Sequence, residues 1–336
     1  PNPLDNMSDE LQNGDALGDA IIKEINEAST AGTAVVSKRL GFLNIYPGDT
    51  KPLDDKVTEY LVNIQNEYPS LPLWVIMQDG DDDNFYGDLS INLWKSIYNS
   101  KHFLKKGEPI VLLCVSPGGD AESAYRIAKL IRNICGDFKI IIPHQAKSAA
   151  TLLALGASDI IMGRDADLGP LDVQIRDSNE ERIYSGLDEV QSLDGLMDFA
   201  NNQIVSTTIY WSRVLRKKKQ IIFPSVIDYV IGMMKPLMEK IDTVHYMSLS
   251  RTLRIAEEYA YRLLLDKYGH YHARVIATKF VENYPYHGFI IDKTEGEGIG
   301  LKNITELPER LQTFCDDLLL LTDDCKGCLI GKFYLK

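Results

Sequence analysis

Two short stretches of the sequence place groups suited to acyl-transfer chemistry directly after apolar runs. In residues 116–120, "SPGGD", two adjacent glycines follow a continuous apolar run, and in residues 143–151, "PHQAKSAAT", Ser148 heads an alanine- and leucine-rich segment. A serine nucleophile needs an activated hydroxyl and backbone amides aimed at the developing oxyanion. The serine can supply the hydroxyl, and the glycines allow a ligand to approach main-chain amides closely.

Each stretch also has a purely structural interpretation. Paired glycines are common in tight turns, and Asp120 could cap the helix that follows. Ser148 could cap its own helix in the same way, because serine is a preferred N-cap residue. Taken singly, the two stretches do not decide between a structural and a chemical role.

The elements around these stretches determine whether they meet. Short apolar segments alternate with segments of helical periodicity, which predicts a mainly parallel sheet with crossover helices. The predicted strands cover residues 33–37, 72–79, 109–116, 138–143 and 159–163, and the predicted helices cover 54–68, 90–103, 120–134 and 149–157. Neighbouring parallel strands would bring both turns to the carboxyl edge of the sheet, where open α/β folds bind ligands.

Three long amphipathic segments follow residue 185, and they predict a helical second half. The predicted organisation is an N-terminal extension over 1–33, one α/β domain over 34–310 that becomes helical from about 186, and a C-terminal tail over 311–336. The helices offer more apolar surface than one small sheet needs to cover. This surplus favours a homo-oligomer.

The bulk composition is that of a soluble globular protein, with 45% hydrophobic and 25% charged residues. A formal net charge of −12 argues against general nucleic-acid binding, although residues 213–219, "RVLRKKK", form a basic strip. No apolar run approaches the roughly 20 residues of a membrane span, and no signal peptide opens the sequence. These features predict a cytoplasmic protein without a membrane span.

The five cysteines are too few and too scattered for a disulfide scaffold. Cys114 and Cys135 lie in apolar segments and are expected to pack as small hydrophobic residues. Cys325 and Cys328 form a C-x-x-C pair near Cys315, but no fourth zinc ligand stands close by in the sequence. We therefore predict neither a metal nor, in the absence of a G-x-G-x-x-G turn, a dinucleotide cofactor.

The two stretches, together with "DLGPLD" at 167–172 and "YPYHGFIIDKTEGEGIGL" at 284–301, resemble the Clp protease/crotonase superfold. More closely, the sequence is similar to the serine dehydrogenase proteinase family, relatives of signal peptide peptidase A, over roughly residues 55–305. The resemblance implies a peptidase whose nucleophile is Ser148. It also implies that the oxyanion amides come from Gly118 or Gly119 and from Ala149.

The general base is where the sequence departs from the Clp protease pattern. Where that pattern has a histidine, about 25 residues after the serine, this sequence has Asp172. His287 stands near the position of the pattern's aspartate. We therefore predict a rearranged triad in which His287 is the base and Asp172 orients it, because a triad is recognised by geometry and not by chain order.

Other bases remain open. Signal peptide peptidase A uses a Ser-Lys pair, but Lys147 adjoins Ser148, and successive helix residues point in different directions. Lys147 is therefore assigned to the substrate rim, while a lysine elsewhere or His144 stays an alternative base. His270 and His272 are expected in a surface turn between helices.

The leading functional hypothesis is an endopeptidase that acts on peptides or unfolded segments through an acyl-enzyme. A crotonase-type acyl-CoA enzyme, with Glu122 as acid and base, is the first alternative, and an inactive peptide-binding scaffold is the second. The sequence contains no G-x-x-x-x-G-K-[ST] motif, so ATP-driven unfolding or regulation would require a separate partner.

Overall fold

The fold was analysed in a computed structural model of the 336-residue chain. It describes residues 40–44, 55–78, 87–171, 174–176, 183–284, 286–313 and 329–335. The expected N-terminal extension, the strand expected over 33–37 and the three C-terminal cysteines lie outside these residues.

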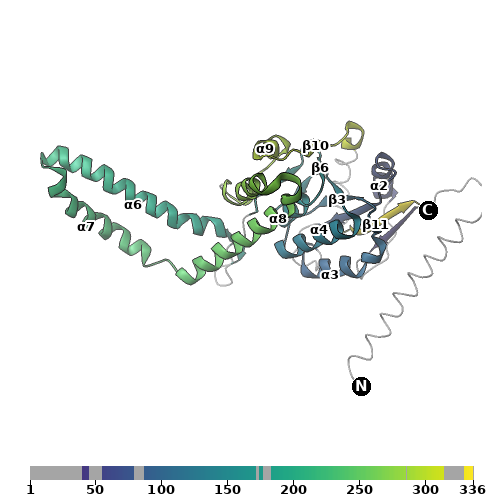
Figure 1. Ribbon diagram of the computed structural model, residues 1–336, viewed down its shortest axis with the longest axis horizontal. Helices are drawn as coiled ribbons and strands as arrows, with labels where there is room; N and C mark the ends of the chain where they lie inside the picture. The colour runs from purple at the N-terminus through teal and green to yellow at the C-terminus, as the bar shows by residue number, and fades with distance from the viewer. Residues whose placement is uncertain are drawn as a thin grey trace, which may run out of the picture.

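A seven-stranded sheet, with the order β1-β11-β2-β3-β4-β6-β10, forms the centre of the described fold (Figure 1). β2, β3, β4, β6 and β10 run parallel to one another, whereas β11 is antiparallel to both β1 and β2. The bounds are β1 Leu40–Asn44, β2 Leu73–Met77, β3 Ile110–Val115, β4 Phe138–Ile142, β6 Asp159–Met162, β10 Ile304–Glu306 and β11 Leu329–Leu335. Two-stranded pairings join β5 Gln145–Ala146 to β7 Asp167–Leu168, and β8 Gln174–Arg176 to β9 Ile183–Ser185.

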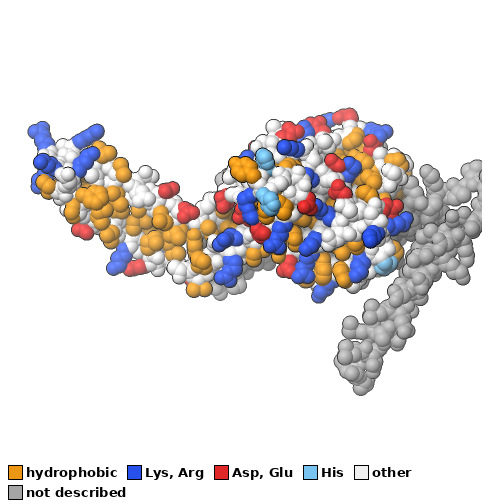
Figure 2. All heavy atoms as spheres, viewed as in Figure 1, with side chains coloured by type: hydrophobic (Ala, Val, Ile, Leu, Met, Phe, Trp, Pro, Cys, Tyr) orange, Lys and Arg blue, Asp and Glu red, His pale blue; other side chains and the backbone are white. Residues whose placement is uncertain are grey.

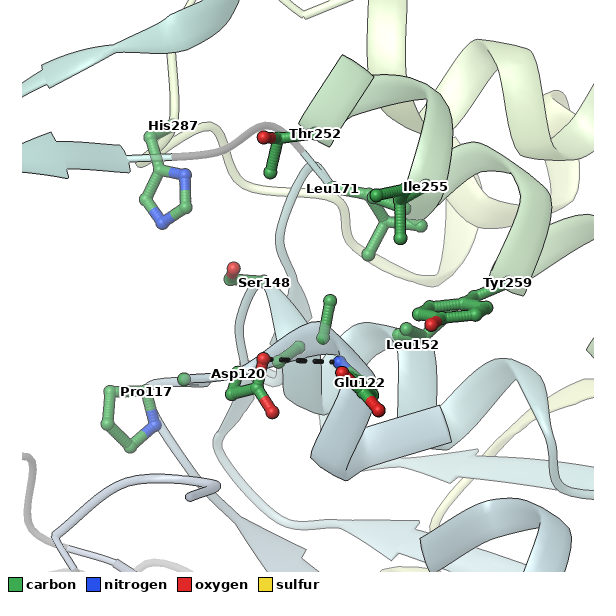
Figure 3. Close-up of a pocket in the computed structure, with 14 residues that line it drawn as sticks. Pro117, Asp120, Glu122, Ser148, Leu152, Leu171, Thr252, Ile255, Tyr259 and His287 are labelled. Atoms are coloured by element: carbon green, nitrogen blue, oxygen red, sulfur yellow. Dashed lines mark hydrogen bonds between the residues drawn. The ribbon is translucent and has the colours of Figure 1, made fainter. Parts of the chain in front are cut away.

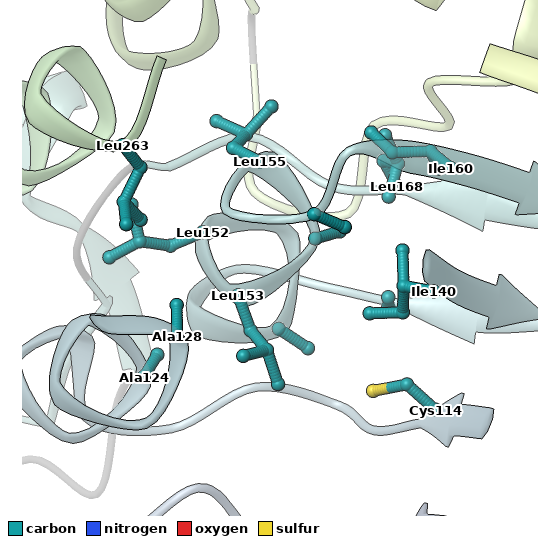
Figure 4. Packing of buried hydrophobic residues seen from close by; sticks show 14 of the residues in the cluster. Cys114, Ala124, Ala128, Ile140, Leu152, Leu153, Leu155, Ile160, Leu168 and Leu263 are labelled. Carbon is teal, nitrogen blue, oxygen red and sulfur yellow. The ribbon is translucent and has the colours of Figure 1, made fainter. Parts of the chain in front are cut away.

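Helices cover both faces of the sheet. On β3, Leu112 and Cys114 belong to one buried cluster, while Val111 and Leu113 belong to the other, as the alternation of a strand requires. The first cluster packs under α3, α4, α5 and α8, and the second packs under α2. Figure 4 shows the part of the first cluster that lies among α4, α5 and α8. The bounds are α2 Asp55–Glu67, α3 Ile91–Asn99, the 3-10 helix Lys101–Phe103, α4 Ala121–Cys135, α5 Ala149–Leu155, α6 Gly186–Leu215, α7 Lys219–Met238, α8 Thr243–Glu282 and α9 Lys293–Ile299.

The predicted fold class is confirmed: the protein is α/β with a mostly parallel sheet, crossover helices and a helical later half. Residues 311–336 were expected to form a C-terminal tail. Part of this segment is a strand instead, because residues 329–335 form β11 inside the main sheet. Ile330 and Phe333 of that strand are buried and anchor it in the core.

The long helices do not all pack on the sheet. α6 and α7 form a hairpin that extends away from the body, and α8 returns from it to the core (Figure 1). Hydrophobic side chains lie along the hairpin, and Lys and Arg side chains gather at its far end (Figure 2), where the basic strip of residues 213–219 joins α6 to α7. Exposed apolar patches of this kind commonly mark contact surfaces. A homo-oligomer that covers them stays a prediction.

The expectation that no segment approaches a membrane span was wrong for one helix. α7 is long and apolar enough to cross a membrane, with a mean hydropathy of 1.4 over 18 residues of which 17% are buried. Asp228 is the single charged residue between Gln220 and Met234, so the stretch is nearly uninterrupted. One such helix is weak evidence of membrane insertion, because core helices and signal sequences have the same length and composition.

Cys114 and Cys135 were predicted to pack as small hydrophobic residues, and the structure confirms this. Cys114 and Cys135 are free and buried. Burial raises the pKa of Cys114 to about 12 and that of Cys135 to about 11, so neither forms an appreciable thiolate at neutral pH. Both act as small hydrophobic residues of the core.

Candidate active site

The paired glycines form the turn between β3 and α4. Gly118 and Gly119 have φ values of 113° and 136°, a region that side chains with a Cβ rarely adopt. Asp120 then caps α4, since its carboxylate accepts the amide of Ser123 at 2.8 Å. The structural role predicted for Asp120 is thus present, and the glycines lie where the backbone needs them.

The turn that carries Ser148 (the serine turn, residues 143–148) lies directly against the turn that carries Gly118 and Gly119 (the glycine turn, residues 116–120). The backbone amide of Lys147 donates to the carbonyl of Ser116 at 3.0 Å, and the amide of Ser116 donates to the carbonyl of Gln145 at 3.1 Å. A Cβ placed on Gly118 would lie 2.6 Å from the carbonyl oxygen of Lys147 and 2.9 Å from the Cβ of Ser148. The convergence predicted from the parallel topology is therefore observed, at van der Waals distance.

Ser148 has a strained backbone. Its φ of 49° and ψ of −118° place it, with Arg216, among the two non-glycine residues of positive φ in the described chain. Such a conformation costs on the order of 1–3 kcal/mol and persists where its surroundings impose it, often at functional sites. The side chain makes no capping hydrogen bond to α5, so the interpretation of Ser148 as a helix cap is not supported.

Two backbone amides near Ser148 have no hydrogen-bond acceptor among the described residues. They belong to Gly119 and to Ala149, the first residue of α5. The carbonyl of Gly118 accepts the amide of Leu89 at 2.7 Å, and in a trans peptide the N–H of Gly119 points the opposite way. The amide of Gly118 is already bound to the Ser116 hydroxyl at 3.1 Å, which leaves Gly119 as the available donor of the pair.

Buried polar side chains fix both turns, and sequence reasoning missed them. The hydroxyl of Ser116 donates to the side-chain oxygen of Gln78 at 2.6 Å. Thr151 is fully buried, and its hydroxyl lies 2.7 Å from the carbonyl of Ala146 and accepts the amide of Gly169 at 2.9 Å. A glutamine just after an apolar strand and a threonine inside an apolar helix were the available signals, because buried polar groups need partners.

Ser148 opens into a cavity of about 470 Å³ (Figure 3). The glycine turn and the start of α4 form one wall, and Thr252, Ile255 and Tyr259 of α8 form another. Leu152 and Leu171 complete an apolar side between these walls. The contribution of α8 was not predicted, since helical periodicity does not tell which buried surface a helix face will meet.

His287 lines the same cavity, and its imidazole and the side chain of Ser148 both face the interior (Figure 3). Its loop is held beside β7 by two hydrogen bonds between Leu168 and Ile291, at 2.9 and 3.0 Å. Ser148 and His287 are 139 positions apart in the sequence, and the structure brings them to one cavity.

Lys147 lies elsewhere than the predicted substrate rim. Its ammonium pairs with the carboxylate of Asp167, and the two side chains are only 17% and 15% exposed. The same ammonium is 3.5 Å from the carbonyl oxygens of Leu168 and Phe289. Lys147 is not among the cavity-lining residues, because its side chain is drawn to the carboxylate and joins the serine turn to the loop of His287.

The remaining candidates are distributed as follows. Asp172 lies outside the described residues; Leu171, which precedes it, lines the cavity. His144 does not line the cavity. His270 and His272 are exposed beside Gly269, whose φ of 71° and ψ of 168° break α8, so the expected surface turn between helices is observed.

Glu122 lines the cavity too, and its carboxylate is paired with Arg126 one turn later on α4. The described residues contain no group of three or more His, Cys, Asp or Glu side chains that could hold a metal ion. The cavity thus presents a hydroxyl, an imidazole, a carboxylate and backbone amides.

Comparison with known proteins identifies one family model and two relatives that are similar to this chain. Residues 86–196 match the family model of the ClpP-like SDH-type serine proteinases. The chain is also 26% identical over 211 residues to the uncharacterized protein MJ0137 of Methanocaldococcus jannaschii, covering 63% of this chain and 59% of that protein. To the uncharacterized protein MJ1495 of the same organism it is 25% identical over 228 residues, covering 68% and 61%.

The chain spans about three fifths of the length of these two relatives. The matched family segment contains the glycine turn and Ser148, which line one side of the cavity, and it ends in the first part of α6. The resemblance seen in the sequence is thus confirmed over residues 86–196, the segment that matches the ClpP-like SDH-type serine proteinase family model.

Proposed function

We propose that the protein is a serine endopeptidase in which Ser148 forms an acyl-enzyme with its substrate. The observation that carries the proposal is the strained Ser148, which faces a cavity beside two amides that have no acceptor among the described residues. Backbone strain at a cavity-lining serine and amide donors without an acceptor are both costs to the fold. Acyl transfer is a function that uses the two together.

In the proposed reaction, the hydroxyl oxygen of Ser148 attacks the carbonyl carbon of the scissile peptide, and its proton passes to His287. The amides of Gly119 and Ala149 bind the resulting oxyanion. The proton then passes to the leaving amine as the C–N bond breaks, and water hydrolyses the acyl-enzyme by the same route. Asp172 is assigned to orient His287.

His287 is favoured as the base by its place in the cavity with Ser148. Within the described residues, the Ser148 hydroxyl has no hydrogen-bond partner. Hydrogen bonds between nucleophile and base are often long before substrate binds and tighten in the complex. The Lys147 ammonium is a weaker candidate, since it is already engaged by Asp167 and two carbonyl groups.

A fluorophosphonate probe tests the proposal, because it reacts with activated serine hydroxyls and releases fluoride. We expect one covalent adduct per chain, located by peptide mapping and mass spectrometry on the peptide that contains Ser148. The heat-denatured protein is the control and should not be labelled. An adduct on a different serine, or none after prolonged exposure, would show that Ser148 is not an activated nucleophile.

Gly118→Ala should abolish fluorophosphonate labelling of Ser148 without unfolding the protein. The new Cβ would lie within 3 Å of the serine turn, in addition to the strain of φ 113°. The control is Gly136→Ala, where φ is 84° but no atom lies within 4 Å. Relative to that control, we expect a free energy of unfolding about 1–3 kcal/mol lower in urea titrations. Labelling of Gly118→Ala at the rate of the control would contradict the close approach of the two turns.

A crotonase-type enzyme remains the second candidate because Glu122 lines the same cavity. Such an enzyme would use the same pair of amides for a thioester oxyanion and a carboxylate as acid and base. Micromolar affinity for coenzyme A, combined with no fluorophosphonate adduct, would favour it over the peptidase. The absence of both a fluorophosphonate adduct and affinity for coenzyme A would favour an inactive scaffold.

A further inference from the structure

A second hollow lies on α8 beside the Ser148 cavity. It has a volume of about 520 Å³, and Arg251, Arg254 and Arg262 contribute to its lining. Ile255 and Tyr259 line both hollows and form the ridge between them. The second hollow is therefore a direct continuation of the cavity surface.

The helix geometry explains why two different surfaces adjoin. Positions 251, 254, 258 and 262 recur every three or four residues and share one face of α8, whereas 252, 256 and 259 turn toward the cavity. The ring of Tyr259 stacks on that of Tyr125 in α4, with centroids 4.4 Å apart and planes at 9°. The ridge is thus fixed against the body.

Positively charged side chains outnumber negatively charged ones on the face of α8 that lines the second hollow. Glu258 is its single carboxylate, and it is bound by Arg262 at 2.9 Å and by Arg274 at 3.0 Å. Arg251 and Arg254 are exposed and form no ion pair with any described residue. They stand out in a chain of formal net charge −12.

Other arginines of the body differ in this respect. Among those whose side chains the structure describes, each pairs with a carboxylate: Arg126 with Glu122, Arg132 with Asp266, Arg164 with Glu309, Arg274 with Glu257 and Glu258, and Arg310 with Glu67. Two unpaired guanidinium groups next to the cavity are therefore a local feature of α8, and they differ from the other described arginine side chains of the body.

We propose that Arg251 and Arg254 form a carboxylate-binding subsite of the peptidase. A peptide held at Ser148 crosses the ridge of Ile255 and Tyr259 and brings a carboxylate to the two guanidinium groups. Guanidinium is suited to this role, since its planar fork can bind both oxygens of a carboxylate. The carboxylate is an acidic side chain or the C-terminus of the substrate. This inference rests on the proposed function and names its substrate class.

The test uses the full chain and a fluorogenic peptide library. Its members carry Glu or Gln at one of five positions around a common apolar scissile segment, each with a free and an amidated C-terminus. The measured quantity is the ratio of kcat/KM between paired peptides. We expect an acidic preference of about 3–30-fold in the wild type, because exposed ion pairs are individually weak. It should shrink as salt rises from about 50 to 500 mM.

Arg251→Gln/Arg254→Gln should remove the preference, so that the paired peptides are cleaved with equal kcat/KM. Arg213→Gln/Arg216→Gln is the matched control, since it removes the same charge at the far end of the hairpin. A preference seen in Glu/Gln pairs assigns the subsite to acidic side chains, and one seen in acid/amide pairs assigns it to the C-terminus. An equal preference in the wild type and the Arg251/Arg254 variant overturns the proposal.

The proposed function is checked separately by the rate of fluorophosphonate labelling in every variant. If no peptide is cleaved, fluorescence anisotropy with a fluorescein-labelled Glu peptide and its amidated Gln counterpart measures binding directly. Tighter binding of the acidic peptide that disappears in Arg251→Gln/Arg254→Gln supports the subsite even if hydrolysis fails. Equal affinities for the two peptides overturn it.

Discussion

Replacing Ser148 by alanine is expected to lower kcat for peptide hydrolysis on the order of 10⁶-fold, to the level of catalysis by the remaining groups. The hydroxyl is the nucleophile in the proposed reaction, and no other described side chain of the cavity replaces it. Stopped assays with quenched peptides, together with fluorophosphonate labelling, measure the loss. Both signals should fall together.

The fold should survive this change. Ser148 makes no capping bond to α5, so alanine removes no hydrogen bond seen among the described residues. We expect the melting temperature of Ser148→Ala to stay within about 3 °C of the wild type, since conservative changes that break no contact have small effects. Residual turnover above one per cent in a folded variant would eliminate Ser148 as the nucleophile.

Replacing His287 by alanine is expected to reduce kcat/KM about 10²–10⁴-fold, the usual contribution of a positioned general base. The cause is loss of the proton acceptor that faces the same cavity as the serine. Fluorophosphonate labelling should slow as well, because the hydroxyl is no longer activated.

His272→Ala provides the matched control, as His272 is exposed on the part of α8 beyond Gly269. It should leave kcat/KM and the rate of fluorophosphonate labelling unchanged. A fully active His287→Ala variant would move the base to another residue while leaving the nucleophile in place. In that case Lys147→Met, which removes the ammonium at similar length, becomes the deciding variant.

Much of the framework could be predicted, because its determinants are local. The apolar run at 109–116 and the helical spacing after Asp120 predicted β3 and α4 within a residue or two. The parallel order of the strands then required the glycine and serine turns to meet at one edge. That part of the site follows from periodicity and topology alone.

Other features depend on tertiary contacts and could not be predicted. The positive φ of Ser148 is imposed by neighbours distant in sequence, since serine does not favour that region by itself. Lys147 was assigned to the rim because its partner Asp167, 20 positions away, was not recognised. The wall from α8 was missed because an amphipathic helix pattern identifies a buried face but not its contact surface.

The groups proposed to react and the side chains expected to select the substrate lie on different elements, the first at the sheet edge and the second on α8. The proposed nucleophile and amide donors lie on turns that the parallel strands fix, whereas Thr252, Ile255 and Tyr259 lie on α8, the helix that follows the projecting hairpin. If the protein is the proposed peptidase, substitutions along α8 should change which peptides are accepted without moving the groups proposed to react. Engineering of altered cleavage preference should begin on that helix.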